Sequence, residues 1–383
     1  MKQYLTVWFR TRNPGFTMVN FTILAGGYTS YIAAYLFNTD DNTLTYLDQY
    51  TTGGNPSWII SHPTNKSILY AVNQNAPDGA VQSFTVSPNG ANTLVDTVSS
   101  GGNGPPYCSA LSTGQVAVVN YNSGTARVVP TEGDYLHFSN DSDIWTFPVP
   151  TTSTEGRAEP HMTYEYDNEI FIPDKGNDKI WRLGEVDGNP GNYVVHGEIQ
   201  QPIGSGPRHI RTRDNMLYTI HELASTLTLQ EVPSHPNGTS QILSNVSIIP
   251  HNPPAGSVFA AAEILIPEPT AEYPTPYIYV SNRNTGVQDP RGDTIAIFEN
   301  VNNKLVLRNQ VYTGLDQIRG MMSGEQAGVG GDAYIVAAGF AGTGGVKVFK
   351  RTECGANLEE VTVNTVIPTR TAFVWLNACQ DLQ

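Results

Sequence analysis

The chain contains few cysteines, few charged residues and no long hydrophobic run, and each of these absences excludes a class of protein. None of its apolar segments reaches the roughly 18 residues that a membrane-spanning helix needs. Charged residues make up 15% of the 383 residues, and acids outnumber bases, so the formal net charge is −14. Because nucleic acids and anionic membranes bind basic surfaces, the sequence predicts neither of them as a partner.

The cysteine content excludes a disulfide framework, because the chain has only three cysteines: Cys108, Cys354 and Cys379. Cys108 lies in an apolar neighbourhood, which favours a buried free thiol over a nucleophile. Cys354 and Cys379 both lie near the C-terminus, and the sequence leaves open whether they pair.

The motifs of several common enzyme classes are also missing. The sequence has no Cys/His cluster with zinc spacing, no Gly-Lys-Ser/Thr phosphate loop and no Gly-x-Ser-x-Gly nucleophile elbow. The glycine-rich stretches at 324–331 and 339–345 do not open a helix, so they are interpreted as turns. We therefore expect a protein that uses no cofactor and no metal.

What the sequence does have is abundant glycine (36 residues) and proline (26 residues), with 10% aromatic residues. Short apolar runs bounded by Gly, Pro, Asn and Asp dominate, a pattern typical of strands and turns. One unit recurs: a Gly/Pro turn, a short strand, a second turn and an apolar strand that ends in a polar residue. The turn prolines of the first four copies, Pro56, Pro106, Pro160 and Pro207, are spaced by 50, 54 and 47 residues.

A repeat of this length predicts an all-β fold, the β-propeller, in which four-stranded antiparallel blades surround a central channel. Six copies are visible, and further strands remain at both ends, at 21–25 and 361–374. We therefore predict seven blades, the last closed by pairing of the N- and C-terminal strands, which removes exposed edges. A parallel β-helix, the structural alternative, has much shorter repeats.

No domain boundary is evident. Residues 1–17 are predicted to form an N-terminal extension, and residues 18–383 a single propeller domain. The apolar run at 4–9 is too short for a secretory signal peptide, so we expect a cytoplasmic location rather than secretion.

Polar residues follow the apolar strands at equivalent places in successive copies. Because side chains alternate along a strand, only one of two adjacent rings of residues can face the channel at a given level. One ring would contain Gln74, Tyr121, Lys175, Glu222 and Arg283, and the other Asn73, Asn120, Asp174, His221 and Asn282.

Four groups of residues are distinctive in their order along the chain: Gly54-Asn55-Pro56-Ser57-Trp58, Asn120-Tyr121-Asn122-Ser123-Gly124, Pro160-His161 with Pro173-Asp174, and Gly206-Pro207-Arg208-His209 with Glu222-Leu223-Ala224-Ser225. Together they resemble the seven-bladed lactonase family, which includes fungal carboxy-cis,cis-muconate cyclases and bacterial 6-phosphogluconolactonases. The resemblance extends from Asn20 to Trp375. Both branches share these motifs, so the resemblance is less specific about activity than about fold.

The resemblance implies a metal-independent site at the mouth of the channel, and its matching positions are His161, Arg208, Glu222 and Arg283. We expect His161, Glu222 and Arg208 to be catalytic, and Arg283, Asp174 and Lys175 to bind substrate. The sixth copy departs from the family pattern, because residues 317–321 replace the usual turn that contains Pro-Arg, which puts the substrate in doubt. The acidic ligand set of calcium-dependent sugar lactonases is not found.

These residues also have structural interpretations. His161 could be a turn histidine satisfied by backbone groups, and Arg208 and Glu222 could form a purely structural ion pair. His209 and His221 are expected to pack between blades.

The first hypothesis for function is an intramolecular lyase similar to carboxy-cis,cis-muconate cyclase, a cycloisomerase that forms a lactone from an unsaturated polycarboxylate. Two arginines would hold substrate carboxylates, and His161 or a Glu222 of raised pKa would protonate the adjacent carbon. The alternatives are a lactone hydrolase similar to 6-phosphogluconolactonase and a non-catalytic ligand-binding propeller. In each case the partner is a small anionic molecule or a lactone, and the oligomeric state is left open.

Overall fold

The computed structural model describes residues 19–149, 156–188, 191–325, 329–376 and 379–380. Within these ranges the chain forms strands and turns, and its short 3₁₀ helices include η1 (Val186–Gly188), η3 (Gly331–Ala333) and η4 (Glu353–Gly355). None of the described helices is long and apolar enough to cross a membrane. The predicted extension at residues 1–17 lies outside the described residues.

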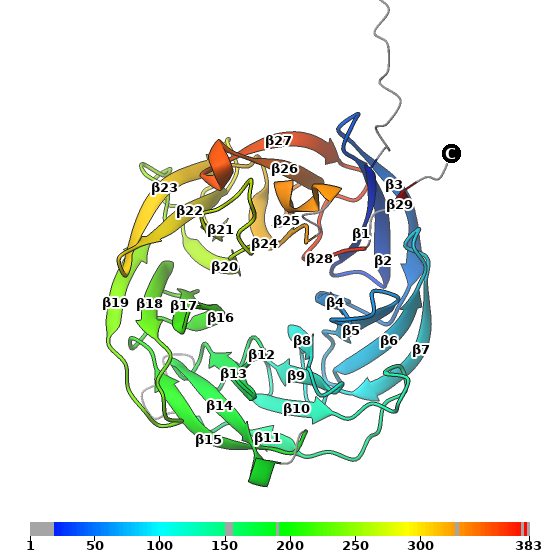
Figure 1. The fold of residues 1–383 in the computed structure, drawn as a ribbon, viewed down its shortest axis with the longest axis vertical. Helices are drawn as coiled ribbons and strands as arrows, with labels where there is room; N and C mark the ends of the chain where they lie inside the picture. The colour runs from blue at the N-terminus through cyan, green and yellow to red at the C-terminus, as the bar shows by residue number, and fades with distance from the viewer. Residues whose placement is uncertain (1–18, 150–155, 189–190, 326–328, 377–378, 381–383) are drawn as a thin grey trace, which may run out of the picture.

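Seven antiparallel sheets stand in a ring around a central axis (Figure 1). Six of them contain four strands that follow one another in the chain, and the seventh contains five. The predicted all-β, seven-bladed propeller is therefore confirmed. We call the axial region between the seven inner strands the channel.

The inner strands border the channel. They are β4 (Ile59–Ser61), β8 (Tyr107–Ala110), β12 (Tyr164–Tyr166), β16 (Pro207–Arg213), β20 (Phe259–Leu265), β24 (Asp316–Ser323) and β28 (Ala372–Trp375).

The second strands are the apolar strands of the sequence repeat. They are β5 (Ile68–Asn73), β9 (Val116–Asn120), β13 (Glu169–Asp174), β17 (Met216–His221), β21 (Ile278–Asn284), β25 (Tyr334–Ala341) and β1 (Val19–Gly26). β5, β9 and β17 are buried at every residue, because neighbouring blades cover both faces of each sheet.

The two outer strands of each blade complete the sheets. The third strands are β6 (Ala80–Val86), β10 (Thr125–Val129), β14 (Lys179–Glu185), β18 (Thr226–Glu231), β22 (Thr294–Val301), β26 (Val346–Thr352) and β2 (Tyr31–Asn38). The fourth strands are β7 (Asn92–Ser99), β11 (Ile144–Thr146), β15 (Tyr193–Gln200), β19 (Ile242–Ser247), β23 (Lys304–Tyr312), β27 (Asn357–Asn364) and β3 (Thr43–Thr51).

The seventh blade joins the two ends of the chain, as predicted. β28 pairs with β1 in a register that places Trp375 opposite Ile23 and Ala372 opposite Gly26. A fifth strand, β29 (Cys379–Gln380), also pairs with β1. The rings of Phe21 and Trp375 meet edge to face at 5.6 Å, so apolar packing reinforces the closure.

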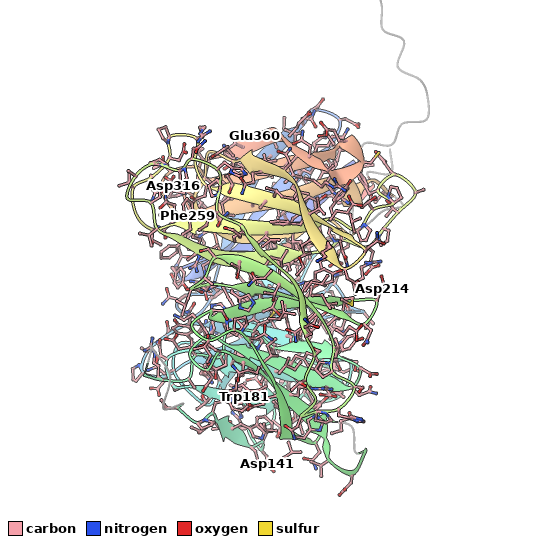
Figure 2. The ribbon with its side chains drawn as sticks, turned by 90° about the vertical axis from the view of Figure 1, so that its left-hand side faces the viewer. Asp141, Trp181, Asp214, Phe259, Asp316 and Glu360 are labelled. Atoms are coloured by element: carbon pink, nitrogen blue, oxygen red, sulfur yellow. The ribbon has the colours of Figure 1, made fainter. Side chains whose placement is uncertain are left out.

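The inner strands run from one face of the disc to the other. Figure 2 shows Phe259 and Asp316, the first residues of β20 and β24, on one side, and Asp214, which directly follows β16, on the opposite side. We call the end of the channel where the inner strands begin the upper mouth, and the end where they finish the lower mouth.

Candidate functional site

A β-bulge in β16 places Arg208 at the upper mouth. The register between β16 and β17 shifts between Pro207 and His209, so Arg208 lies outside the regular ladder. Its Nε donates a hydrogen bond of 3.0 Å to the carbonyl oxygen of Ala262 on the next blade. The preceding Gly206 has a φ of 66°, and an added side chain there would collide with Leu223 and Lys175, so the turn requires glycine. The Gly-Pro-Arg sequence thus has a direct structural role.

Glu222 lies between two arginines. One carboxylate oxygen pairs with Nη1 of Arg208, and the other lies 3.1 Å from Nη2 of Arg283. Burial alone would raise the pKa of Glu222, but the charges of Arg208, Arg283 and Lys175 outweigh it and hold the pKa below its ordinary value. Of the two proton donors that the sequence suggested, His161 and a Glu222 of raised pKa, the second does not fit, because the charges around it keep the Glu222 carboxyl group ionised near neutral pH.

Arg319, on the sixth blade, completes a group of three arginines. It occupies a second bulge, where the register of β24 with β25 shifts between Ile318 and Gly320. Its guanidinium contacts the hydroxyl of Tyr28 and lies 3.5 Å from Oε1 of Gln74. Sequence reasoning noted this segment only as a departure from the family pattern. The signal that could have revealed Arg319 is its position, which matches that of Arg208 in its blade.

The cluster around Glu222 contains more arginines than carboxylates. Arg208, Arg283 and Arg319 lie close enough to interact electrostatically, and Glu222 is the carboxylate placed among them. Burial and then the charge of Arg208 lower the pKa of Arg283 to about 10. A negatively charged ligand would relieve this repulsion.

His161 lies beside the arginines and is almost fully buried, with an exposed fraction of 3%. Its backbone nitrogen donates to the carbonyl oxygen of Pro173, and its ring meets Tyr121 edge to face at 5.8 Å. Burial, followed by the charges of Arg208 and other cations, holds the pKa of His161 well below its ordinary value. The imidazole is therefore neutral near pH 7, so one of its ring nitrogens carries a lone pair that can accept a hydrogen bond.

The other two predicted residues differ in their placement. Lys175 extends over the ring of Tyr121, and its Nζ lies 2.8 Å from Oε2 of Glu159, while its charge also acts on Glu222. Asp174 instead accepts hydrogen bonds from Asn177, from Trp181 and from backbone nitrogens of its own blade. The structure thus brings Lys175 to the cluster and gives Asp174 a place in its own hairpin.

The second ring of polar residues, formed by Asn73, Asn120, Asp174, His221 and Asn282, is buried inside the blades next to the site. Each side chain bonds to the third strand of its own blade or to the loop before it: Asn73 to Gln82, Asn120 to Thr125, His221 to Thr228 and Asn282 to Thr294. These residues are at most 4% exposed. The two rings therefore divide as the alternation of side chains predicts, with one ring at the channel and one inside the blades.

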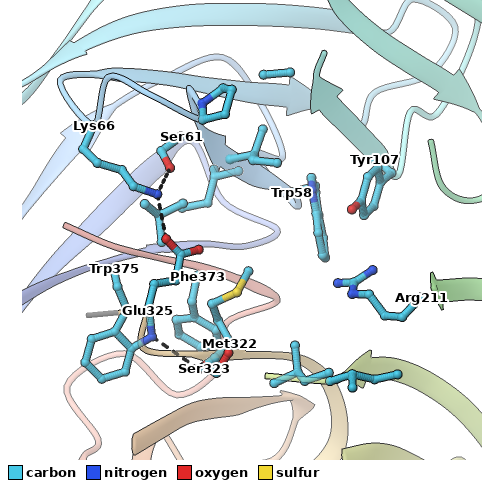
Figure 3. A pocket seen from close by; sticks show the side chains of 17 residues that line it. Trp58, Ser61, Lys66, Tyr107, Arg211, Met322, Ser323, Glu325, Phe373 and Trp375 are labelled. Carbon is cyan, nitrogen blue, oxygen red and sulfur yellow. Dashed lines mark hydrogen bonds and ion pairs between the residues drawn. The ribbon is translucent and has the colours of Figure 1, made fainter. Parts of the chain in front are cut away.

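The lower mouth holds a cavity of about 430 Å³ that sequence reasoning did not anticipate (Figure 3). Trp58 and Tyr107 line it and stack at 4.2 Å, and Arg211 and Trp375 also line it. Lys66 extends towards Glu325, with Nζ and Oε2 2.9 Å apart. Trp58 and Tyr107 also contact the ring of His209 edge to face, so an aromatic layer lies between this cavity and His161.

The two cysteines whose side chains are described, Cys108 and Cys354, are not among the residues that line the lower cavity. Cys108 is buried and free, as predicted, and burial raises the pKa of its thiol. Cys354 is exposed and free, and the side chain of Cys379 lies outside the described residues. Across the described ranges, no group of three or more His, Cys, Asp or Glu residues is arranged to hold a metal ion.

Comparison with known proteins adds a family assignment. Residues 22–375 match the family model described as Lactonase, 7-bladed beta-propeller. A solved structure from Lactobacillus plantarum has a TM-score of 0.78 at 21% identity, covering 94% of this chain and 100% of that chain. The periplasmic gluconolactonase of Pseudomonas aeruginosa has a TM-score of 0.76 at 18% identity, covering 94% and 99%.

A third solved structure, a proposed 6-phosphogluconolactonase from Bacteroides fragilis, has a TM-score of 0.77 at 18% identity, covering 96% of this chain and 100% of that chain. At these identities the likeness shows the fold alone. No curated protein sequence matches the chain.

Proposed function

The chain belongs to the family of seven-bladed lactonases, and from this premise we propose that it is an enzyme that hydrolyses a negatively charged lactone. The observation that carries the proposal is the cluster of three arginines around Glu222 at the upper mouth. Three guanidinium groups, those of Arg208, Arg283 and Arg319, surround one carboxylate in a chain whose net charge is −14. A local cationic site inside an acidic protein selects for anionic ligands.

The residues at this mouth can supply both groups that lactone hydrolysis needs. Nε2 of His161 would take a proton from a water molecule as its oxygen attacks the lactone carbonyl carbon. A guanidinium would stabilise the negative charge that develops on the carbonyl oxygen. The acyl–oxygen bond of the ring then breaks, and the proton held by His161 passes to the leaving alkoxide, which returns the imidazole to its neutral form.

Glu222 would orient the arginines. Because it binds Arg208 through one oxygen and Arg283 through the other, it fixes the planes of both guanidiniums. Two planar donors held in fixed positions suit a carboxylate or a phosphate group. A sugar lactone with a phosphate, as the name of the Bacteroides fragilis neighbour suggests for that protein, fits this arrangement.

A second candidate is the cyclisation of 3-carboxy-cis,cis-muconate. Three guanidiniums on three blades match the three carboxylates of that molecule, which favours this candidate. Its reaction requires a proton donor, so His161 would have to be protonated after the substrate has neutralised the arginines. Hydrolysis is preferred because the buried imidazole is neutral without substrate.

The two candidates are separated by parallel assays on one preparation. Acid release from 6-phosphogluconolactone and from the uncharged gluconolactone is followed with a pH indicator, after subtraction of spontaneous hydrolysis. Loss of the diene absorbance of 3-carboxy-cis,cis-muconate is followed in the ultraviolet. We expect faster hydrolysis of the phosphorylated lactone than of the uncharged one.

Arg208→Ala should abolish this preference. Arg291→Ala is the matched control, because Arg291 is 55% exposed and pairs with Asp289 away from the cluster. Diene loss without lactone hydrolysis would select the cyclase, and the absence of both activities would leave the non-catalytic binding propeller.

A further inference from the structure

Three buried side chains from successive blades form a continuous hydrogen-bonded row behind the site. Nδ1 of His161 lies 3.1 Å from Nε2 of His209, and Nδ1 of His209 lies 3.0 Å from Oε1 of Glu263. The exposed fractions of these residues are 3%, 1% and 0%. The row leads from the upper mouth towards the lower cavity, whose lining residue Arg211 lies 3.8 Å from Glu263.

The position of each proton along this row is determined by the ionisation of Glu263, the last residue of the row. Glu263 accepts hydrogen bonds from Nδ1 of His209 and from the backbone nitrogen of Ile264, and the charge of Arg211 lies nearby, so these contacts favour the carboxylate against the neutral form that burial favours. A carboxylate only accepts hydrogen bonds, so Nδ1 of His209 must carry a hydrogen. Burial lowers the pKa of His209, whose ring is therefore neutral, and its Nε2 must be an acceptor.

The same logic fixes His161. Because Nε2 of His209 accepts, Nδ1 of His161 must donate, and the neutral ring of His161 then has its lone pair on Nε2. Within the described part of the chain Nε2 has no hydrogen-bond partner, so it is the nitrogen left for a ligand.

We propose that His209 and Glu263 are positioning residues that hold His161 in the tautomer whose Nε2 accepts the proton of the attacking water. This inference rests on the proposed hydrolase function. The two residues act through His161 and contact no reacting atom.

Two further observations favour positioning over simple packing. Glu263 lies in an irregular segment of β20, where the register with β21 shifts between Ala261 and Ile264, and its second oxygen, Oε2, is buried without a hydrogen-bond partner among the described residues. A buried carboxylate stabilises a fold less than a well-packed apolar residue would. Trp58 and Tyr107 hold the ring of His209 edge to face, which fixes its orientation towards both neighbours.

The decisive comparison is between His209→Phe and His209→Gln. Phenylalanine fills the space against Trp58 and Tyr107 but offers no acceptor to His161, whereas the glutamine carbonyl does. The tautomer of His161 is read from the ¹⁵N chemical shifts of labelled imidazole rings, with His161→Asn identifying its signals. We expect the Nδ1–H form in the wild type and in His209→Gln, and its loss in His209→Phe.

The kinetic test compares the effect of each variant on kcat with its effect on KM. Because a wrong tautomer removes the base but not the arginines, kcat of His209→Phe should fall about 10²-fold or more while KM changes little. His209→Gln should restore most of the activity. The double variant His209→Phe/Glu263→Met removes the buried carboxylate that the single variant leaves unpaired. Its circular dichroism and thermal unfolding are measured beside kcat, so that a loss of kcat in a folded protein is attributed to the row and not to unfolding.

An Nε2–H tautomer of His161 in the wild type would overturn the proposal, and so would a double variant with unchanged kcat. The spectra decide the tautomer even if no lactone is turned over. The expected tautomers together with no hydrolysis would contradict the proposed function and leave the row of hydrogen bonds intact.

Discussion

The two mouths of the channel are built from the same seven inner strands, yet their chemistry differs. At the upper mouth three arginines surround one carboxylate. At the lower mouth aromatic side chains line the cavity, and its cations have acidic neighbours, Glu325 beside Lys66 and Glu263 near Arg211. The arginines of the upper cluster thus share one carboxylate, Glu222, whereas each of these two cations at the lower mouth has an acidic neighbour of its own.

The difference follows from the backbone. Arg208 and Arg319 lie at bulges in β16 and β24, where the strands leave their regular ladders. At the lower ends of these strands the ladders are regular, with Arg211 opposite Tyr218 and Met322 opposite Val336. Bulges redirect side chains without altering the rest of a sheet, so a propeller can change its ligand at one mouth while the other continues to hold the ring together.

The largest effect is expected from removal of the proposed base. His161→Asn should lower kcat by about 10³-fold while KM changes little, because general base catalysis contributes factors of this order. Steady-state kinetics on the preferred lactone would measure the change. A variant with kcat near that of the wild type would move the chemistry away from this residue.

Arg319 tests whether the third guanidinium belongs to the same site. Arg319→Ala should lower kcat/KM for a charged lactone by about 10²-fold, since truncation of a partly buried charged contact costs about 2–3 kcal/mol. Arg319→Lys should recover part of the loss. If all three proteins have equal kcat/KM, then Arg319 serves only to hold Tyr28 and Gln74.

Because His221 is buried in the ring behind the upper mouth, we expect the folded protein to lose stability at acidic pH. Burial lowers the pKa of His221 to about 3 in the folded protein, against 6.5 when exposed. Between about pH 3 and pH 6.5 the His221 ring is therefore protonated in the unfolded chain but not in the folded protein. The free energy of unfolding consequently falls as the pH drops below 6.5. The loss from this group should be about 2 kcal/mol at pH 5.

Denaturant unfolding at pH 7.5 and pH 5 measures this effect. His221→Asn should reduce the difference, because asparagine occupies the equivalent positions at Asn73, Asn120 and Asn282 and bonds to the third strand. An unchanged pH dependence in this variant would assign the acid sensitivity to other groups, with His161 and His209 the next to test.

The smallest effect is expected at the lower mouth. Glu325→Gln breaks the pair with Lys66, but the glutamate side chain is 60% exposed, so stability should change by less than about 0.5 kcal/mol. Activity should not change, because the aromatic layer lies between this pair and His161. A marked loss of activity would show that the two mouths are coupled.

The fold could be predicted because the sequence marks every blade in the same way. Each second strand is a short apolar run, and in most blades a polar residue at or near its end bonds to the neighbouring strand inside the blade. The closing blade followed from the strands left over at both ends. These signals are local in the sequence, so they can be recognised without knowledge of distances in the structure.

The site could be predicted only in part. His161, Arg208, Glu222 and Arg283 follow from motifs and lie together in the structure. Arg319 and Glu263 were not predicted as site residues, because they lie at β-bulges that no turn proline marks in the sequence. The sequence left open whether Glu222 has a raised pKa, because burial and ion pairing shift the pKa in opposite directions and only distances decide between them.

The closure of the ring through β1 and β28 has a consequence for protein synthesis. β1 leaves the ribosome early, whereas its inner neighbour is made only when nearly all the other strands have emerged. Throughout elongation one edge of β1 is open, and Phe21 lacks the indole of Trp375. A growing chain is thus exposed to pairing with other nascent chains until the end of translation, so we expect premature termination before residue 372 to yield aggregates rather than a smaller folded protein.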